Sequence, residues 1–395
     1  MWSSDIPVLR PGDVVAARME PGPEWRGLVE LVWGAGAALF PIDHRLPSAE
    51  VDPLLAAVRP AVLVDPRGGR RLDGAVPAPE GDAVLVATSG TAGAPKIVRL
   101  SRSSVDAAVA ASALALEADP HDGWLCCLPL GHIGGLLVLL RSVLLGAPVA
   151  IHARFDPEAV AAVAGVRFVS LVPRMLARLL DRGVDVARFR TILVGGGALP
   201  VELRDRARGA GATVVETYGL TESCGGIVYG GVPLPGVGVR IGPQGGIQLS
   251  GAMLMRGYRF DEAATAAVFT PDGWLKTRDA GDLGPDGRLR VLGRMDEVIV
   301  TGGEKVWPAE IEMALRAHPK VAQVAVAGRP DEDWGARVVA WVVPADPLDP
   351  PTLGELREHV GGSLPRYRAP RELEVVDQLP RTALGKLRRS RLEPD

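Results

Sequence analysis

The most informative stretch of the sequence is Val86-Ala-Thr-Ser-Gly-Thr-Ala-Gly-Ala-Pro-Lys96. It follows an apolar run of strand length and combines two glycines, three hydroxyl side chains and a closing lysine. Glycines let backbone N–H groups converge on an anion, hydroxyls add donors, and the lysine supplies a positive charge. The spacing differs from the G-x-x-x-x-G-K-[ST] loop, because Gly90 and Gly93 are only three residues apart and Pro95 precedes the lysine. The stretch predicts a phosphate-binding loop, with a plain surface turn as the alternative.

Strands and helices are predicted to alternate on both sides of this loop. Apolar runs of strand length occur at 14–18, 37–41, 61–65, 83–87, 123–128, 148–152, 168–172 and 191–194. Helical spacing of apolar residues occurs at 23–34, 103–117, from 135 onward, at 157–164 and at 174–182. Such alternation predicts an α/β protein whose mostly parallel sheets are covered by helices.

The pattern changes towards the C-terminus. Residues 239–292 are short runs punctuated by glycine, typical of a small β-rich subdomain. Expected elements then follow at 298–300, from Pro308, at 321–326, 338–343 and 353–364, ahead of a basic tail. We therefore expect an N-terminal domain over residues 1–295 and a small α+β C-terminal domain over 296–395.

A second motif is Glu216-Thr-Tyr-Gly-Leu-Thr-Glu222, directly after an expected strand at 213–215. A carboxylate beside a threonine at a strand end suits Mg²⁺, which takes few protein oxygens and leaves room for phosphate. A capping cluster before a helix is the alternative for this motif taken alone.

Two further motifs lie downstream. Asp279 is expected at a strand end, where its carboxylate can accept hydrogen bonds from ribose hydroxyls, and Arg294 can reach a sugar or a phosphate. Pro380-Arg-Thr-Ala-Leu-Gly-Lys386 puts a lysine in a glycine-bearing loop near the chain end. Taken singly, these motifs are equally consistent with solvated turns.

Composition excludes several classes of protein. The 395 residues carry 44 Lys+Arg and 47 Asp+Glu, so the net charge of −3 argues against a nucleic-acid-binding protein. Three cysteines, two of them adjacent, form neither a disulfide framework nor a zinc spacing, and no secretory signal opens the chain. The apolar run 133–151 contains Arg141 and is broken by Gly146 and Pro148, so we expect a buried segment, no membrane span, and a cytoplasmic location.

The four motifs together, in this order and at these intervals, resemble the adenylate-forming superfamily, which includes acyl- and aryl-CoA synthetases, peptide-synthetase adenylation domains and luciferases. The resemblance runs from about Gly12 to Arg391. It implies a large N-terminal domain and a mobile C-terminal lid. It also implies an ATP-dependent carboxylate–CoA ligase, in which ATP and a carboxylate form an acyl-adenylate and pyrophosphate before a thiol displaces AMP.

The resemblance also implies roles for individual residues. For the nucleotide these are Thr88, Ser89, Gly90, Thr91, Gly93, Lys96, Gly195, Gly196, Gly197, Glu216, Thr217, Tyr218, Gly219, Asp279 and Arg294. Glu222 is implied to bind Mg²⁺, and Lys386, Glu222, Thr221 and His132 to be the catalytic set. Asp296 is the expected hinge. Gly302, Gly303 and Glu304 belong to the face used in thioester formation.

The motif Leu128-Pro-Leu-Gly-His-Ile-Gly-Gly resembles the corresponding segment of compact o-succinylbenzoate–CoA ligases of menaquinone biosynthesis. In that resemblance His132 gates the acyl pocket, although a histidine bonded to backbone at a helix start remains the alternative. Arg141 is a lone cation in an apolar helix. It either pairs with an internal acid or faces a second carboxylate of the substrate.

Two positions depart from the family pattern: Ala92 replaces a threonine of the phosphate loop, and Arg278 replaces the glycine before Asp279. A secondary-metabolism ligase acting mainly in the thioester half-reaction, or an adenylation enzyme that loads a carrier protein, therefore stays open. The expected substrates and cofactors are ATP, Mg²⁺, coenzyme A and an aromatic or polycyclic carboxylate. A homodimer is an additional open expectation.

Overall fold

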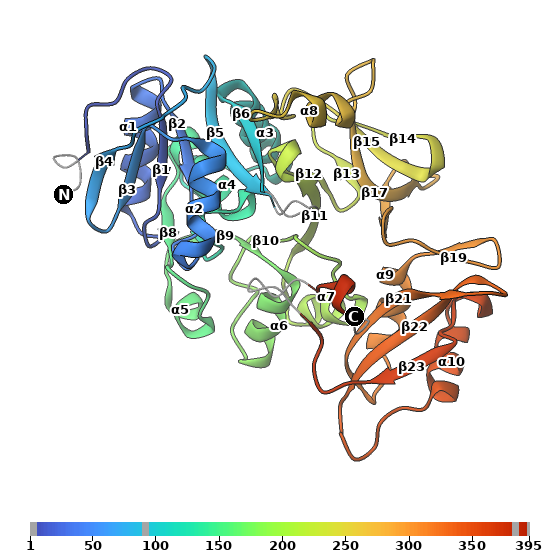
Figure 1. Cartoon of the computed structure of the whole chain (residues 1–395). Coiled ribbons are helices and arrows are strands. Elements are labelled where there is room, and N and C mark those ends of the chain that lie inside the picture. The colour runs from blue at the N-terminus through green and yellow to red at the C-terminus, as the bar shows by residue number, and fades with distance from the viewer. Residues whose placement is uncertain (1–5, 89–94, 381–386, 393–395) are drawn as a thin grey trace. The chain divides into compact units, whose positions relative to one another are not determined.

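The computed structural model describes residues 6–88, 95–380 and 387–392 (Figure 1). Within these ranges the chain divides into two compact units. The first comprises residues up to 240, 248–276 and 285–289, and the second comprises 241–247, 277–284 and the chain from 290 onward. The predicted domain boundary at 295/296 lies a few residues beyond the last crossing between units. Compactness does not locate a pivot, so that boundary stays a prediction.

A mixed sheet opens the first unit. Its described strands, in spatial order, are β16 (Gly257–Tyr258), β6 (Lys96–Ser101), β5 (Asp82–Thr88), β2 (Ala38–Pro41), β1 (Val14–Ala17), β3 (Val62–Asp65) and β4 (Gly68–Arg71). The central strands β5, β2, β1 and β3 pair in parallel, whereas β6, β16 and β4 pair antiparallel at the edges. The expected strands are confirmed, and the antiparallel edges are additions to the predicted parallel core.

A second sheet in the same unit carries more of the motif residues. Its described strands are β13 (Val232–Pro233), β12 (Gly225–Tyr229), β11 (Val214–Leu220), β10 (Thr191–Val194), β9 (Val166–Leu171), β7 (Gly123–Cys126) and β8 (Val149–Ile151). Strands β11, β10, β9, β7 and β8 are parallel to their neighbours, and β12 and β13 turn back antiparallel.

Helices fill the space on both sides of these sheets. The helices of the first unit are α1 (Glu24–Gly34), α2 (Ser48–Val58), α3 (Arg102–Leu116), α4 (Ile133–Leu145), α5 (Pro157–Ala162), α6 (Pro173–Asp181), α7 (Val201–Gly209) and α8 (Glu262–Val268). Helix α1 contacts the first sheet and α4 contacts the second, and α4 packs against both α1 and α3. These three helices thus join the two sheets into one unit.

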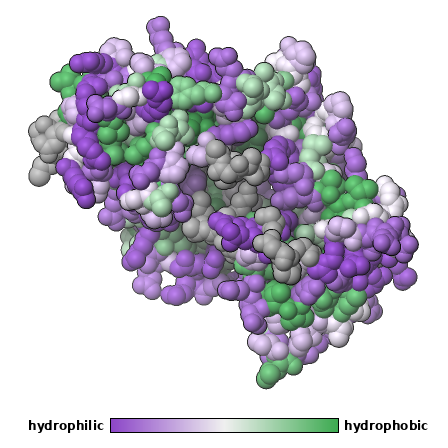
Figure 2. All heavy atoms as spheres, viewed as in Figure 1, coloured by the Kyte–Doolittle hydropathy of each residue, from purple (hydrophilic) through white to green (hydrophobic). Residues whose placement is uncertain are grey.

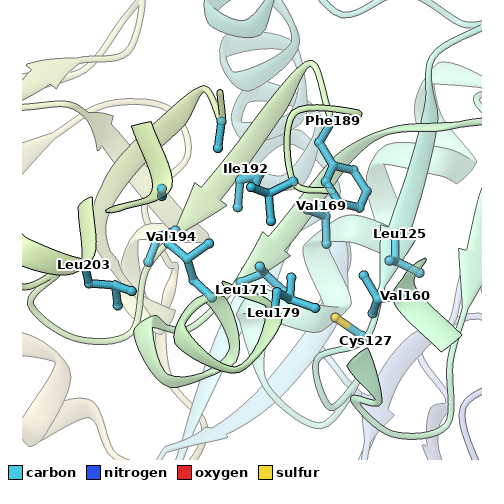
Figure 3. Packing of buried hydrophobic residues seen from close by; sticks show 14 of the residues in the cluster. Leu125, Cys127, Val160, Val169, Leu171, Leu179, Phe189, Ile192, Val194 and Leu203 are labelled. Carbon is cyan, nitrogen blue, oxygen red and sulfur yellow. The ribbon is translucent and has the colours of Figure 1, made fainter. Parts of the chain in front are cut away.

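The core beneath the second sheet is apolar (Figure 3). Val169 and Leu171 from β9, together with Ile192 from β10, meet Leu179 from α6 and Leu203 from α7. All are nearly or fully buried, which is the largest favourable contribution to the folding of such a layer. The packing fixes the carboxyl ends of β10 and β11, where the glycine-rich and glutamate motifs lie.

The remaining described strands lie in three smaller sheets. These are β14 (Gly238–Ile241), β15 (Gly246–Ser250), β17 (Leu275–Leu283) and β18 (Leu289–Arg294); β19 (Ile299–Thr301) with β20 (Glu304–Val306); and β21 (Val321–Asp331), β22 (Gly335–Pro344) and β23 (Glu372–Val375). Helices α9 (Pro308–Arg316) and α10 (Leu353–Gly361) cover one face of the last sheet. The predicted α+β character of the C-terminal region is confirmed.

The distribution of hydrophobic side chains can be followed on one face of the molecule. Hydrophilic side chains dominate the face shown in Figure 2, and hydrophobic ones form small separate patches. Among the helices that the structure describes, none combines the length and apolarity needed to cross a bilayer.

Candidate active site

The predicted phosphate loop connects two antiparallel strands. β5 ends at Thr88, β6 begins at Lys96, and these two residues pair directly. The Thr88 hydroxyl donates to the Lys96 carbonyl at 3.4 Å. Both side chains are partly exposed at the mouth of the hairpin. Ser89, Gly90, Thr91 and Gly93 lie outside the described residues, as does Ala92, so their roles stay predictions.

The two segments predicted to line the adenine, called the adenine-side segments below, lie on neighbouring strands. Gly195, Gly196 and Gly197 follow β10, and Glu216–Gly219 belong to β11, which pairs in parallel with β10. The Thr217 hydroxyl donates to the Val194 carbonyl at 3.4 Å, so the segments touch. The Glu216 carboxylate accepts from Arg204 at 3.1 Å.

Strand β11 is longer than the sequence predicts. The expected strand ended at Val215, but β11 continues to Leu220 because residues from Thr217 onward pair with β12. Glu216 therefore lies within a strand. Thr221 and Glu222 form the single turn that follows it, so Glu222 is the carboxylate at the strand end.

Glu222 contacts a residue that the sequence analysis missed. Its Oε1 accepts a hydrogen bond of 2.9 Å from the hydroxyl of Tyr258. The ammonium of Lys96 lies 4.8 Å from the centroid of the same tyrosine ring. The three residues come from β6, from the turn after β11 and from β16, and the structure brings them together. Nothing in the residue type of Tyr258 signals this contact, which depends on pairing between β16 and β6.

The Glu222 site fits a magnesium ion that is held by one protein carboxylate together with substrate phosphates and water. Among the described residues, no group of three or more His, Cys, Asp or Glu side chains could hold a metal. Mg²⁺ needs no such cage, because it is commonly held by one or two carboxylates together with substrate phosphates and water. Glu222 is a hard oxygen donor at a partly exposed position, so its chemistry fits that mode.

The predicted ribose and hinge residues form a charge network within the second unit. Arg294 donates to Asp279 at 3.2 Å and to Asp296 at 3.3 Å, and Arg278 donates to Asp296 at 2.7 Å. Asp279 is buried and lies inside β17, not at a strand end as predicted, because β17 continues to Leu283. The network gives Arg278, which departs from the family pattern, a partner in Asp296, the predicted hinge residue.

The predicted thioester-face motif is a two-residue turn between β19 and β20. Thr301 pairs with Glu304, leaving Gly302 and Gly303 as the central residues at φ of 58° and 84°. Such a turn needs positive φ at both positions, which explains the glycine pair. The Gly302 N–H donates to the Trp334 carbonyl at 2.9 Å.

Lys386 lies outside the described residues, and the chain beside it is anchored. Across the gap, the Arg388 N–H donates to the Pro380 carbonyl at 2.9 Å. Arg389 forms ion pairs with Glu312 at 2.6 Å and Glu297 at 2.9 Å.

His132 lies at the start of α4 beside an ion pair between Asp43, which is buried, and Arg45, which is exposed. Asp43 accepts two hydrogen bonds from the Arg45 guanidinium, at 2.6 and 2.9 Å. Burial lowers the pKa of His132, a shift that the Asp43 carboxylate opposes and the Arg45 cation reinforces. His132 is therefore held towards its neutral form.

Arg141 is 3% exposed and its described partners are neutral. It donates to Ser112 Oγ at 3.1 Å and to the Tyr229 hydroxyl at 3.2 Å, and it lies 5.0 Å from the Trp124 ring centroid. Among the described ion pairs none includes Arg141, so the internal acid considered in the sequence analysis is not found there. These contacts favour a structural role, and substrate contact stays a prediction.

Comparisons with known proteins give a consistent result. Residues 71–259 match the AMP-binding enzyme family, and residues 310–386 match the C-terminal domain of AMP-binding enzymes. The probable 2-succinylbenzoate–CoA ligase of Mycobacterium tuberculosis is 41% identical over 380 residues, covering 91% of this chain and 95% of that protein. This chain belongs to the AMP-binding enzyme family.

Other relatives agree. The 2-succinylbenzoate–CoA ligase of Bacillus subtilis is 36% identical over 336 residues, covering 79% of this chain and 68% of that protein. The solved structure of the Bacillus subtilis o-succinylbenzoate CoA synthetase with its acyl-adenylate intermediate has a TM-score of 0.87 and 31% identity, covering 98% of this chain and 89% of that one. The resemblance and the two-part adenylate-forming fold expected from the sequence are confirmed.

Proposed function

We propose that the protein is an ATP-dependent 2-succinylbenzoate–CoA ligase. The observation that carries this proposal is the 41% identity to the Mycobacterium tuberculosis relative over nearly the full length of both chains. The Lys96–Tyr258–Glu222 arrangement at the mouth of the phosphate hairpin supports it independently, because it places a cation and a carboxylate together where a metal–phosphate substrate could bind.

The chemistry takes place in two steps. The substrate carboxylate attacks the α-phosphorus of ATP, forming the acyl-adenylate and releasing pyrophosphate. The CoA thiol then attacks the acyl carbon, and AMP leaves. A magnesium ion, when bound, supplies charge neutralisation for the phosphates. Lys96 adds a point charge near the phosphate loop, and Asp279 and Arg294 offer an acceptor and a donor for the ribose.

Lys386 has a separate role in this proposal. It offsets negative charge as the carboxylate approaches the phosphate, an electrostatic effect typically worth about 10²–10³ in rate.

Asp296 serves as a hinge in this proposal, so that one lid presents either the Lys386 loop or the Gly302–Glu304 turn. An Asp296→Pro variant, with φ fixed near −65°, should impair CoA ligation more than adenylation.

A pyrophosphate-release assay tests the function. Purified protein with ATP and Mg²⁺ should release pyrophosphate with 2-succinylbenzoate, and adding CoA should yield the thioester by mass spectrometry. The matched controls are 4-oxo-4-phenylbutyrate, which lacks the ring carboxylate, and 2-propanoylbenzoate, which lacks the chain carboxylate. Absence of thioester with 2-succinylbenzoate would refute the proposal.

We propose as a second candidate function a ligase that chiefly forms the thioester from an adenylate made elsewhere. It is favoured by Ala92 and Arg278, which depart from the family pattern in the motifs predicted to bind the nucleotide. Arg278 donates a hydrogen bond of 2.7 Å to Asp296, the proposed hinge residue. An Ala92→Thr/Arg278→Gly double variant should then release pyrophosphate faster. If the unaltered enzyme already makes adenylate faster than it consumes supplied adenylate with CoA, this alternative fails.

Two further proposals concern the setting of the enzyme. The three described cysteines are free and buried, which supports a reducing, cytoplasmic location. A homodimer is also proposed, and sedimentation equilibrium across a concentration series would test it.

A further inference from the structure

Tyr258 occupies a special place between two opposite charges. Its side chain is 7% exposed, its hydroxyl donates to Glu222 Oε1 at 2.9 Å, and its ring lies under the Lys96 ammonium at 4.8 Å. Both contacts are energetically meaningful: the first is a hydrogen bond to a carboxylate and the second a cation–π contact within 6 Å.

The tyrosine is rigidly held. Its strand β16 pairs with β6, and the flanking Arg256 and Arg259 N–H groups donate to the carbonyls of Arg99 and Ile97 at 2.9 and 2.8 Å. The Tyr258 N–H donates to Thr265 Oγ1 at 2.8 Å. These contacts fix the backbone from which the Tyr258 ring projects.

The Glu222 backbone is attached to the same segment. Its carbonyl accepts from the Met255 N–H at 2.8 Å, so Glu222 and Tyr258 move together. No ion pair joins Lys96 and Glu222, although both are described and both contact the same ring. Left without a spacer, an ammonium and a carboxylate this close to a common side chain would attract one another and pair directly.

We infer that Tyr258 is a positioning residue that separates Lys96 from Glu222 and aims each at its own ligand, Lys96 at phosphate and Glu222 at magnesium. This inference rests on the proposed function. The Tyr258 hydroxyl is neutral and orients the Glu222 carboxylate by donating a hydrogen bond to it. The ring holds the Lys96 ammonium by a cation–π contact and leaves its positive charge in place. A direct ion pair between Lys96 and Glu222 would have to break before Lys96 could bind phosphate and Glu222 could bind magnesium.

Two variants separate the two contacts. Tyr258→Phe keeps the ring and removes the hydroxyl, and Tyr258→Leu removes both. ATP binding is measured by calorimetry with Mg²⁺ and again with excess EDTA. Tyr258→Phe should weaken binding about tenfold with Mg²⁺, the effect of one lost hydrogen bond to a charged group, and leave binding in EDTA unchanged. Tyr258→Leu should weaken both.

Two control variants show whether the effect of Tyr258→Phe on ATP binding comes only from a change in protein stability. Tyr229→Phe removes a hydroxyl from a tyrosine that is 8% exposed and hydrogen-bonded to Ser112. It should alter the melting temperature without changing the ratio of the two affinities. Glu222→Gln should abolish the magnesium dependence, and adding Tyr258→Phe to it should then have no further effect.

The outcomes are distinct. If the unaltered protein binds ATP with Mg²⁺ dependence and Tyr258→Phe binds within twofold of it in both conditions, the inference is wrong and the proposed function stands. An equal loss with and without Mg²⁺ in Tyr258→Phe also overturns the inference. If the unaltered protein does not bind ATP, the inference and the proposed function fail together.

Discussion

Three glycines of the adenine-side segments should respond to alanine in a graded way. A Cβ at Gly197 would meet nothing within 4 Å, one at Gly195 would lie 2.4 Å from Thr217 Oγ1, and one at Gly219 would lie 1.9 Å from the Gly225 carbonyl oxygen. An added Cβ at Gly197 therefore meets no obstacle, one at Gly195 meets a side-chain atom, and one at Gly219 meets backbone.

The magnitudes follow from what must move. An ordinary contact of a Cβ atom is about 3.4 Å or longer, so Gly219→Ala forces β11 and β12 roughly 1.5 Å apart beside their existing register shift. Overpacking of this kind costs about 1–3 kcal/mol where side chains can yield, and more where backbone must yield. We expect Gly197→Ala within about 0.5 kcal/mol of the parent, Gly195→Ala about 1–2 less stable, and Gly219→Ala more than about 3 less stable.

Urea denaturation of the three variants measures these differences, and AMP binding by calorimetry shows whether the segment keeps its shape. Gly195→Ala/Thr217→Ala is an internal check: it removes the obstructing hydroxyl and should be less destabilised than the two single losses added together. If Gly219→Ala is as stable as the parent, or if Gly197→Ala is the most damaging of the three, the reasoning from close approach is wrong.

Three other predictions follow. Lys386→Ala should block pyrophosphate release but spare thioester formation from supplied acyl-adenylate, and equal loss in both half-reactions would contradict the two-orientation lid. Arg141→Leu should lower the melting temperature and the turnover of 2-succinylbenzoate and benzoate alike, because Ser112 and Tyr229 enclose the guanidinium; a rise of about tenfold in KM confined to 2-succinylbenzoate would instead show substrate contact. Because burial lowers the pKa of His132, the unfolded chain takes up more protons below about pH 6.5, so stability should fall as pH decreases from 7 to 5, and His132→Asn should reduce that slope in urea titrations.

The sequence was sufficient for elements with a strong local pattern. The runs at 23–34, 103–117 and 191–194 match α1, α3 and β10 to within a residue or so. Their apolar periodicity and punctuation are local properties.

Elements stabilised mainly by distant contacts were missed. Helix α2 contains Pro53, which argues against a helix, yet Val51, Leu54 and Val58 bury one face of it against the first sheet. Packing there outweighs local propensity. Strand β11 was predicted too short for the same reason, because its second half is a strand only through its pairing with β12.

The site divides along similar lines. Glu222 and Lys96 could be predicted because they stand in compact motifs whose residue types suit phosphate and metal. Tyr258 could not, since its contact with Glu222 spans 36 residues and requires β16 to lie beside β6. Asp43 and Arg45, beside His132, also belong to a segment far away in the chain.

The charge network around Asp296 has a consequence for the effect of salt. The Arg278 and Asp296 side chains are 50% and 39% exposed, whereas Asp279 is largely buried beside Arg294. Dissolved ions screen exposed pairs far more than buried ones, over a Debye length of about 8 Å at physiological ionic strength and about 3 Å at 1 M. Raising the concentration of sodium chloride should therefore weaken the contacts of Asp296 with Arg278 and Arg294 more than the contact between Arg294 and Asp279. Ionic strength would then act as an external control on the freedom of the proposed hinge, leaving the ribose-side residues in place.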